Sequence, residues 1–321
     1  MLRRLILCIG CLSGVVLAGP AGATRGTQNP VGAQAPAFRS STSAVAVDVS
    51  VRDRSRRTVV GLTAKDFVVL DNGVRQDVSE ISYGTRPIDV TVGLDVSASV
   101  TGEVLNSLRR AVFQLMRDLK KEDRLKLLLV NAEVHRAVDF TADVKAVENA
   151  MRRVPAGGGT ALHDALSVAL VGASDPNRRQ LVMFFTDGAD SGSAISTALL
   201  ETVAQRTRAT VTFVVSGGTS LLNFGPGQFG NSAITTFGGG RGRPVDPLFN
   251  RLAVETGGTV ISSDGTATLG STFRRILDEF RSTYVLFFSP TGVDRAGFHT
   301  LTVEVSRPDV IVQARRGYFG R

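Results

Sequence analysis

The sequence has almost no cysteine and no tryptophan. Its 321 residues contain only two cysteines, Cys8 and Cys11, and both lie close to the amino terminus. If this leading segment is removed on export, the mature chain contains no thiol. It then forms no disulfide bond and has neither a thiolate metal ligand nor a thiol nucleophile. Any bound metal must therefore be held by oxygen or imidazole ligands.

A long apolar run is also missing. Arg3 and Arg4 precede a mostly apolar stretch from Leu5 to Leu17, and small residues follow at 21–23. This pattern predicts a signal peptide over residues 1–23 and an exported protein, either periplasmic or extracellular. The alternatives are a membrane anchor and a lipoprotein signal at Cys11. The apolar stretch is short of the roughly 20 residues that a membrane-spanning helix needs, and no run of that length follows it.

Basic residues are numerous but do not form a tract. The net charge is +8, of which Arg3 and Arg4 supply two, so +6 remains after cleavage. The arginine pairs are scattered and are not interleaved with aromatic residues, which disfavours nucleic-acid binding. With 43% hydrophobic and 21% charged residues, the composition predicts a globular protein of one or two domains. Nothing in it indicates an oligomeric state.

The first part of the mature chain has β character. Residues 24–43 are rich in Gly, Pro, Ser, Thr and Gln, which predicts a flexible linker. Residues 44–86 then predict a small β module. Valines alternate from Val45 to Val51, and "DNG" at 71–73 predicts a hairpin turn between strands 67–70 and 74–81.

From residue 87, apolar strands alternate with amphipathic helices. Strands are expected at 88–95, 124–130, 133–139, 181–185, 210–215, 258–262 and 283–289, and helices at 102–120, 143–152, 160–173, 193–207, 244–256 and 268–281. This order predicts an α/β domain over 87–289, with a doubly wound, mostly parallel sheet covered by helices on both faces. A Gly-rich insertion, 217–243, is expected to be a surface loop. Residues 290–321 are expected to form a hairpin around "RPD" that packs with the amino-terminal module in a β sandwich.

Three polar clusters stand at strand ends or helix starts. "LDVSAS" ends the first sheet strand, "GGGT" precedes a helix, and "TDG" ends the strand near 186. In an open α/β sheet, ligands bind at the carboxyl ends of the strands, so these clusters are expected to converge. The candidate ligands are Asp95, Ser97, Ser99, Thr160 and Asp187. Such an oxygen set suits a hard cation, most of all Mg²⁺, with Mn²⁺ or Ca²⁺ as alternatives.

These three clusters, in this order and spacing, resemble the metal-ion-dependent adhesion site of von Willebrand factor type A (vWA) domains. The flanking segments "VSVRDRSRRTVVGLTAKDFVVLDNGVRQDV", "LAVETGG", "ILDEFRSTYVLFFSP" and "RRGYFG" are similar to the secreted vWA proteins frequent in acidobacteria. The resemblance implies that Ser97 and Ser99 bind the ion directly, while Thr160 binds it directly or through water. Asp95 and Asp187 would hold coordinated waters. It also implies a partner protein that offers an acidic side chain to the ion.

Other interpretations of these residues stay open. Asp95 or Thr160 could simply cap a helix, and Asp187–Gly188 could be an ordinary turn. A metal-stabilised envelope scaffold and a metal-dependent hydrolase are alternative functions. No phosphate-binding loop or nucleophile elbow is present in the sequence. His163 lies near the site but is expected to pack against its neighbours, so no catalytic residue is assigned and an enzyme is not expected.

Overall fold

In the computed structural model, the described residues are 44–320 except for 101, 155, 172–174, 176, 189, 217, 220–234, 237–242, 245 and 264–267. The predicted signal peptide, the linker and most of the 217–243 insertion lie outside this range. From the insertion and its edge, only the backbones of three two-residue strands are described: β10 (Gly218–Thr219), β11 (Thr235–Thr236) and β12 (Arg243–Pro244). No helix in the described part of the chain is long and apolar enough to cross a membrane.

The largest element is a seven-stranded sheet with the order β11-β13-β9-β8-β5-β6-β7. Besides β11 it contains β5 (Ile88–Asp95), β6 (Arg124–Val130), β7 (Val134–Thr141), β8 (Arg179–Thr186), β9 (Thr210–Ser216) and β13 (Val260–Ser263). All pairs are parallel except β6 with β7. The chain runs from β5 outward to β7 and then resumes at β8, on the other side of β5. The strand order therefore reverses between β5 and β8.

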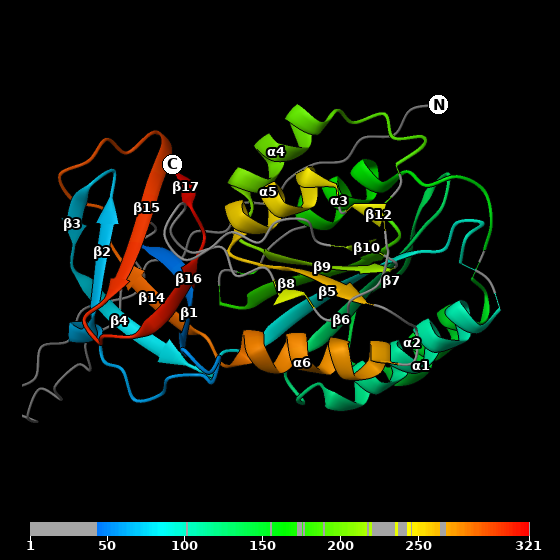
Figure 1. Cartoon of the computed structure of the whole chain (residues 1–321), viewed down its shortest axis with the longest axis horizontal. Coiled ribbons are helices and arrows are strands. Elements are labelled where there is room, and N and C mark those ends of the chain that lie inside the picture. The colour runs from blue at the N-terminus through cyan, green and yellow to red at the C-terminus, as the bar shows by residue number, and fades with distance from the viewer. Residues whose placement is uncertain are drawn as a thin grey trace, which may run out of the picture. The chain divides into compact units, whose positions relative to one another are not determined.

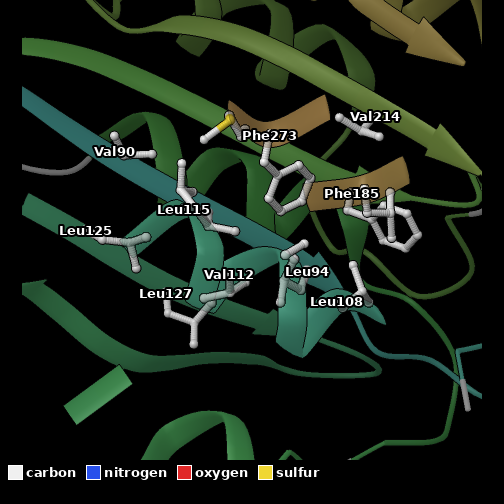
Figure 2. Packing of buried hydrophobic residues seen from close by; sticks show 14 of the residues in the cluster. Val90, Leu94, Leu108, Val112, Leu115, Leu125, Leu127, Phe185, Val214 and Phe273 are labelled. Carbon is white, nitrogen blue, oxygen red and sulfur yellow. The ribbon is translucent and has the colours of Figure 1, made fainter. Parts of the chain in front are cut away.

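Helices cover both faces of this sheet, as predicted (Figure 1). They are α1 (Glu103–Asp118), α2 (Val144–Arg152), α3 (Leu162–Val171), α4 (Thr197–Arg206), α5 (Pro247–Thr256) and α6 (Leu269–Arg281). One core lies under α1, α2 and α6, and the other lies under α3, α4 and α5. Figure 2 shows Leu108, Val112 and Leu115 of α1 against Leu94 and Phe185 of the sheet in the first core.

The expected helices are present, but several begin later than predicted. α4 begins at Thr197 rather than 193, because the Ser196 side chain caps it by accepting from the backbone N–H of Leu199. α5 begins at Pro247 rather than 244, because Asp246 is its N-cap and accepts from Leu248 N–H at 2.8 Å. Proline at the first helical position has the φ that a helix requires.

The two flanks of the chain form two small antiparallel sheets. One has the order β16-β1-β14-β4 and the other β17-β15-β2-β3. Their strands are β1 (Val45–Asp53), β2 (Phe67–Asp71), β3 (Val74–Gln76), β4 (Val78–Tyr83), β14 (Tyr284–Phe288), β15 (Gly297–Val305), β16 (Val310–Ala314) and β17 (Gly317–Gly320), with a short 3₁₀ helix at Ala64–Asp66. Both sheets contribute to one core, which makes the unit a β sandwich.

Local patterns in this sandwich were predicted correctly. Val47, Val49 and Val51 are fully buried, as the alternation indicates. Asn72 and Gly73 form the two-residue turn between β2 and β3 with φ of 47° and 80°. A two-residue turn of this kind needs positive φ at both positions, which asparagine and glycine tolerate.

Three expectations about the strands were wrong. The 283–289 strand does not close the parallel sheet, because β14 pairs antiparallel with β1 and β4. The strand expected at 74–81 is two strands in different sheets, β3 and β4. The carboxyl-terminal hairpin is absent, since β15 pairs with β2 and β17 while β16 pairs with β1. An apolar pattern reports how buried a strand is and does not identify its neighbour.

Polar contacts join the sandwich to the large sheet and to its helices. The Arg179 guanidinium at the start of β8 donates to Asp48 Oδ1 of β1 at 2.7 Å. Buried Arg315 donates to the carbonyls of Gln205 and Thr207 at the end of α4, at 3.2 and 2.7 Å. Burial lowers the pKa of Arg315 to about 10, so it is charged at neutral pH. Its charge is compensated by carbonyl oxygens that the end of a helix leaves unpaired.

Candidate metal centre

Asp95 is the last residue of β5 and starts the first loop of the site. All eight residues of β5 are buried, and the Asp95 side chain is fully covered. Its Oδ1 accepts the backbone N–H of Ser97 at 3.0 Å. A short acidic side chain that bonds its own backbone two residues on forms a tight turn. The loop therefore leaves the sheet abruptly, at the point where the strand order reverses.

Hydrogen bonds connect this loop to the end of β8. Ser97 Oγ lies 3.1 Å from Ser99 Oγ, and Ser99 Oγ donates to Asp187 Oδ2 at 2.8 Å. Ser97 is buried, whereas Ser99 is exposed and Asp187 is half-buried. The structure thus places Asp95, Ser97, Ser99 and Asp187 in one connected group of oxygens that opens toward the surface.

Thr160 comes from a second loop that follows α2. The Gly157 N–H donates to Val96 O at 2.9 Å, and Gly158 O accepts the Ala98 N–H at 3.1 Å. These bonds hold the "GGGT" segment against the "DVSAS" loop. Gly157 and Gly158 have φ of 126° and 80°, which side-chain-bearing residues rarely adopt. Thr160 is buried, and its connection to the "DVSAS" loop runs through the backbone of Gly157 and Gly158, three and two residues before it.

A third segment fixes Thr160 from the opposite side. Its N–H donates to Ser191 Oγ at 2.8 Å, and its carbonyl accepts the Ser191 N–H at 2.9 Å. A Cβ on Gly159 would lie 2.6 Å from the same Ser191 Oγ, so only glycine leaves room for this pair of bonds. Three loops are therefore linked to one another at the carboxyl edge of the sheet.

Residues 90–189, which include all three polar clusters, match the family profile described as von Willebrand factor type A domain. The chain contains a von Willebrand factor type A domain. The match spans less than a third of the sequence, and no curated protein matches the chain.

Several solved structures are similar to this chain. A von Willebrand factor type A protein from Catenulispora acidiphila is 12% identical, with a TM-score of 0.50, over 86% of this chain and 73% of that one. BatB from Bacteroides thetaiotaomicron is 13% identical, with a TM-score of 0.44, over 60% of this chain and 98% of that one. A point mutant of the PilB minor pilin from Streptococcus sanguinis is 13% identical, with a TM-score of 0.46, over 63% of each. At 12% identity, the likeness to the Catenulispora acidiphila protein shows a shared fold and nothing more.

The electrostatics of the vWA site favour a cation. Burial raises the pKa of Asp95, and the nearby negative charge of Asp187 raises it further, although hydrogen bonds from Ser97 and Thr186 oppose the rise. The buried carboxylate of Asp95 and the half-buried carboxylate of Asp187 therefore lie close enough to repel each other. Within the described residues, no three His, Cys, Asp or Glu side chains cluster. The donor set is instead two carboxylates and three hydroxyls, which fits a hard divalent ion.

Two residues of the vWA site were missed by sequence reasoning. Thr186 donates to Asp95 Oδ2 at 3.0 Å and is fully buried. A polar residue at the end of the apolar strand 181–185 was a usable signal for it. Ser191 had no such signal, because its role depends on the conformation of two loops.

His163 packs against its neighbours, as the sequence indicated. Its Nδ1 lies 3.3 Å from the Ile195 carbonyl, and its backbone N–H contacts Asp190 and Ser193. Asp190 also accepts the Leu162 N–H at 2.8 Å. Burial opposes ionisation of Asp190, but hydrogen bonds from Ser193 and from the start of α3 lower its pKa. Asp190 and His163 thus anchor the loop after β8 to α3.

Proposed function

We propose that this protein binds a divalent cation, most of all Mg²⁺, and through it a carboxylate of a partner protein. The observation that supports this most directly is the hydrogen-bonded group of oxygens at the strand-order reversal. The proposed ligand set is Asp95, Ser97, Ser99, Thr160 and Asp187. Ligands commonly bind open α/β sheets at this position.

The five residues of the proposed ligand set would have different roles in binding the ion. Ser97 and Ser99 would bind the ion through their hydroxyl oxygens, and Thr160 would bind it directly or through water. Asp95 and Asp187 would accept hydrogen bonds from waters on the ion and from the serines. When bound, the ion supplies a concentrated positive charge. Since its nearest protein ligands would be neutral hydroxyls, that charge is left available for an acidic group of the partner.

The surroundings of the site suit close approach by another protein. Its exposed neighbours include Ala98, Gly158, Gly159 and Ser191, all of which have small side chains. A partner backbone can therefore come near the ion without displacing bulky groups. Charge attraction at a partly desolvated ion is stronger than in bulk water, which favours an acidic ligand.

The two alternative functions have less support. Hydrogen bonds between the three loops already tie the site together, so we expect the protein to fold without the ion, and any stabilisation by the ion to reflect binding to a preformed site. A hydrolase would need a general base. Asp95 accepts from Ser97 and Thr186, and Asp187 accepts from Ser99, so both carboxylates are engaged in shaping the site. We therefore propose a binding protein and not an enzyme.

We also propose that the protein is exported and that it belongs to the secreted vWA proteins frequent in acidobacteria. The signal-like segment at 1–23 supports a location in the periplasm or outside the cell. The flanking segments that resemble secreted acidobacterial vWA proteins include strands of the sandwich, which supports membership of that group. Cell fractionation together with amino-terminal sequencing of the mature protein tests the first point.

The binding proposal is tested in two stages. Calorimetric titration with Mg²⁺ or Mn²⁺ should show binding to the wild type and a loss in Asp187→Ala. The matched control is Asp139→Ala, because Asp139 is an exposed carboxylate on β7, and it should bind like the wild type. Envelope extract passed over immobilised protein should then yield a partner in Mg²⁺ that EDTA releases and added Mg²⁺ restores. Equal recovery in EDTA, or from Asp187→Ala, would refute metal-dependent partner binding.

A further inference from the structure

Thr186 directly precedes Asp187 and is not one of the proposed metal ligands. It is the last residue of β8, paired in register with Val215 of β9, and its side chain is fully buried. The hydroxyl donates to Asp95 Oδ2 at 3.0 Å and accepts the Gly188 N–H at 3.0 Å. A threonine hydroxyl has a single proton to donate, and here that proton is given to the acid that ends the neighbouring strand.

The first bond fixes the carboxylate of Asp95. One oxygen of Asp95 accepts from Thr186 and the other accepts from the Ser97 N–H at 3.0 Å. The two donors come from separate segments, β8 and the loop after β5. Holding both oxygens fixes the rotation of the carboxylate as well as its location. Bonds that orient a carboxylate in this way commonly decide how well it serves a metal.

The second bond fixes the turn that carries Asp187. It runs from the Gly188 N–H back to the side chain of residue 186, so it encloses Asp187. Gly188 adopts φ of 90° within this turn. Asp187 Oδ2 in turn accepts a hydrogen bond from Ser99 Oγ at 2.8 Å. A single oxygen atom, Thr186 Oγ1, is therefore bonded both to Asp95 and to the turn that carries Asp187.

We propose that Thr186 is a positioning residue of the metal centre, acting through Asp95 and Asp187 without touching the ion. This rests on the proposed function. Thr186→Val keeps the shape of the side chain but removes both hydrogen bonds. Loss of a residue that orients metal ligands typically weakens metal binding by about 10- to 100-fold, and we expect a change of this size. Thr186→Ser keeps the hydroxyl and should bind the ion nearly as well as the wild type.

The experiment measures Mn²⁺ affinity by electron paramagnetic resonance and, separately, thermal unfolding in EDTA. Thr91→Val is the matched control, since Thr91 is a buried threonine inside β5. The proposal predicts weak Mn²⁺ binding by Thr186→Val alone, with rescue in Thr186→Ser. Thr186→Ala serves as a second hydroxyl-free variant if the valine variant does not fold.

The possible outcomes distinguish the positioning role of Thr186 from the proposal that the site binds a metal ion. If the wild type binds Mn²⁺ and Thr186→Val binds it equally well, the positioning role is refuted and the metal site stands. If Thr186→Ser is as weak as Thr186→Val, the hydroxyl is not the operative group and the proposal also fails. A wild-type protein that binds no ion would refute the metal site, and the positioning role with it.

Discussion

We expect Asp95→Asn to be more stable than the wild type in EDTA and less stable than the wild type in Mg²⁺. Asp95 is fully buried, and burial together with the charge of Asp187 raises its pKa, so the ionised form is costly to the folded protein. Asparagine has the same shape and no charge. Its carbonyl can still accept the Ser97 N–H, and its amide can donate to Thr186 Oγ1 after the hydroxyl turns. In EDTA the variant should therefore be the more stable protein.

The expected magnitudes are large enough to measure. Stabilising single substitutions commonly contribute about 0.5–2 kcal/mol to the free energy of unfolding. An ion at about 100 times its Kd stabilises the protein that binds it by about 2.7 kcal/mol. The wild type should gain this amount in Mg²⁺ and Asp95→Asn should gain none, so the order of stability reverses. For domains of about 150–250 residues, 1 kcal/mol corresponds to about 2–4 °C in Tm.

The assay is urea or thermal unfolding of both proteins in EDTA and in Mg²⁺, repeated at lower pH. The pKa of Asp95 in the folded protein lies above its ordinary 3.8. At a pH between 3.8 and the folded pKa, the folded state therefore binds a proton at Asp95 more readily than the unfolded state does. The cost of ionised Asp95 is complete above the folded pKa and disappears as the pH falls toward 3.8. The advantage of Asp95→Asn in EDTA should therefore shrink on acidification. A variant that is less stable than the wild type in EDTA, or a difference that Mg²⁺ leaves unchanged, would refute this reasoning.

Two further predictions concern the framework behind the site. A Cβ on Gly93 would lie 2.2 Å from a ring carbon of fully buried Phe184, so Gly93→Ala should cost about 1–3 kcal/mol in urea unfolding. Adding Phe184→Leu should recover part of this loss, and strictly additive effects would contradict the contact. Arg315→Met leaves carbonyls at the end of α4 without their donor and should cost about 1–3 kcal/mol. It should also speed amide exchange in the last turn of α4, and unchanged exchange there would count against the contact.

Much of the large domain could be predicted because its patterns are local. Continuous apolar strands such as 181–185 are typical of burial on both faces, and helices between them favour a mostly parallel sheet. In such a sheet the carboxyl ends of the strands meet at one edge. The meeting of Asp95 with Asp187 follows from that geometry.

The errors arose where the outcome depends on which segment lies next to a strand. β14 has the same apolar pattern as a parallel-sheet strand, yet it pairs with β1, which lies far earlier in the chain, with Val45 opposite Phe288. Pairing at that separation leaves no trace in the local sequence. The bonds between Thr160 and Ser191 could not be predicted for a similar reason, because they depend on the backbone of two irregular loops.

The way the chain enters and leaves the large domain has a mechanical consequence. It leaves the sandwich after β4 and returns at β14, and these two strands pair, with Tyr83 opposite Tyr284. Tension applied across residues 44 and 320 therefore enters and leaves through sandwich strands. Because β4 and β14 are hydrogen-bonded to each other, the force passes between these two strands and is not transmitted through the large sheet. The sheet edge that carries the candidate metal centre would then keep its geometry under load until the sandwich itself unfolds.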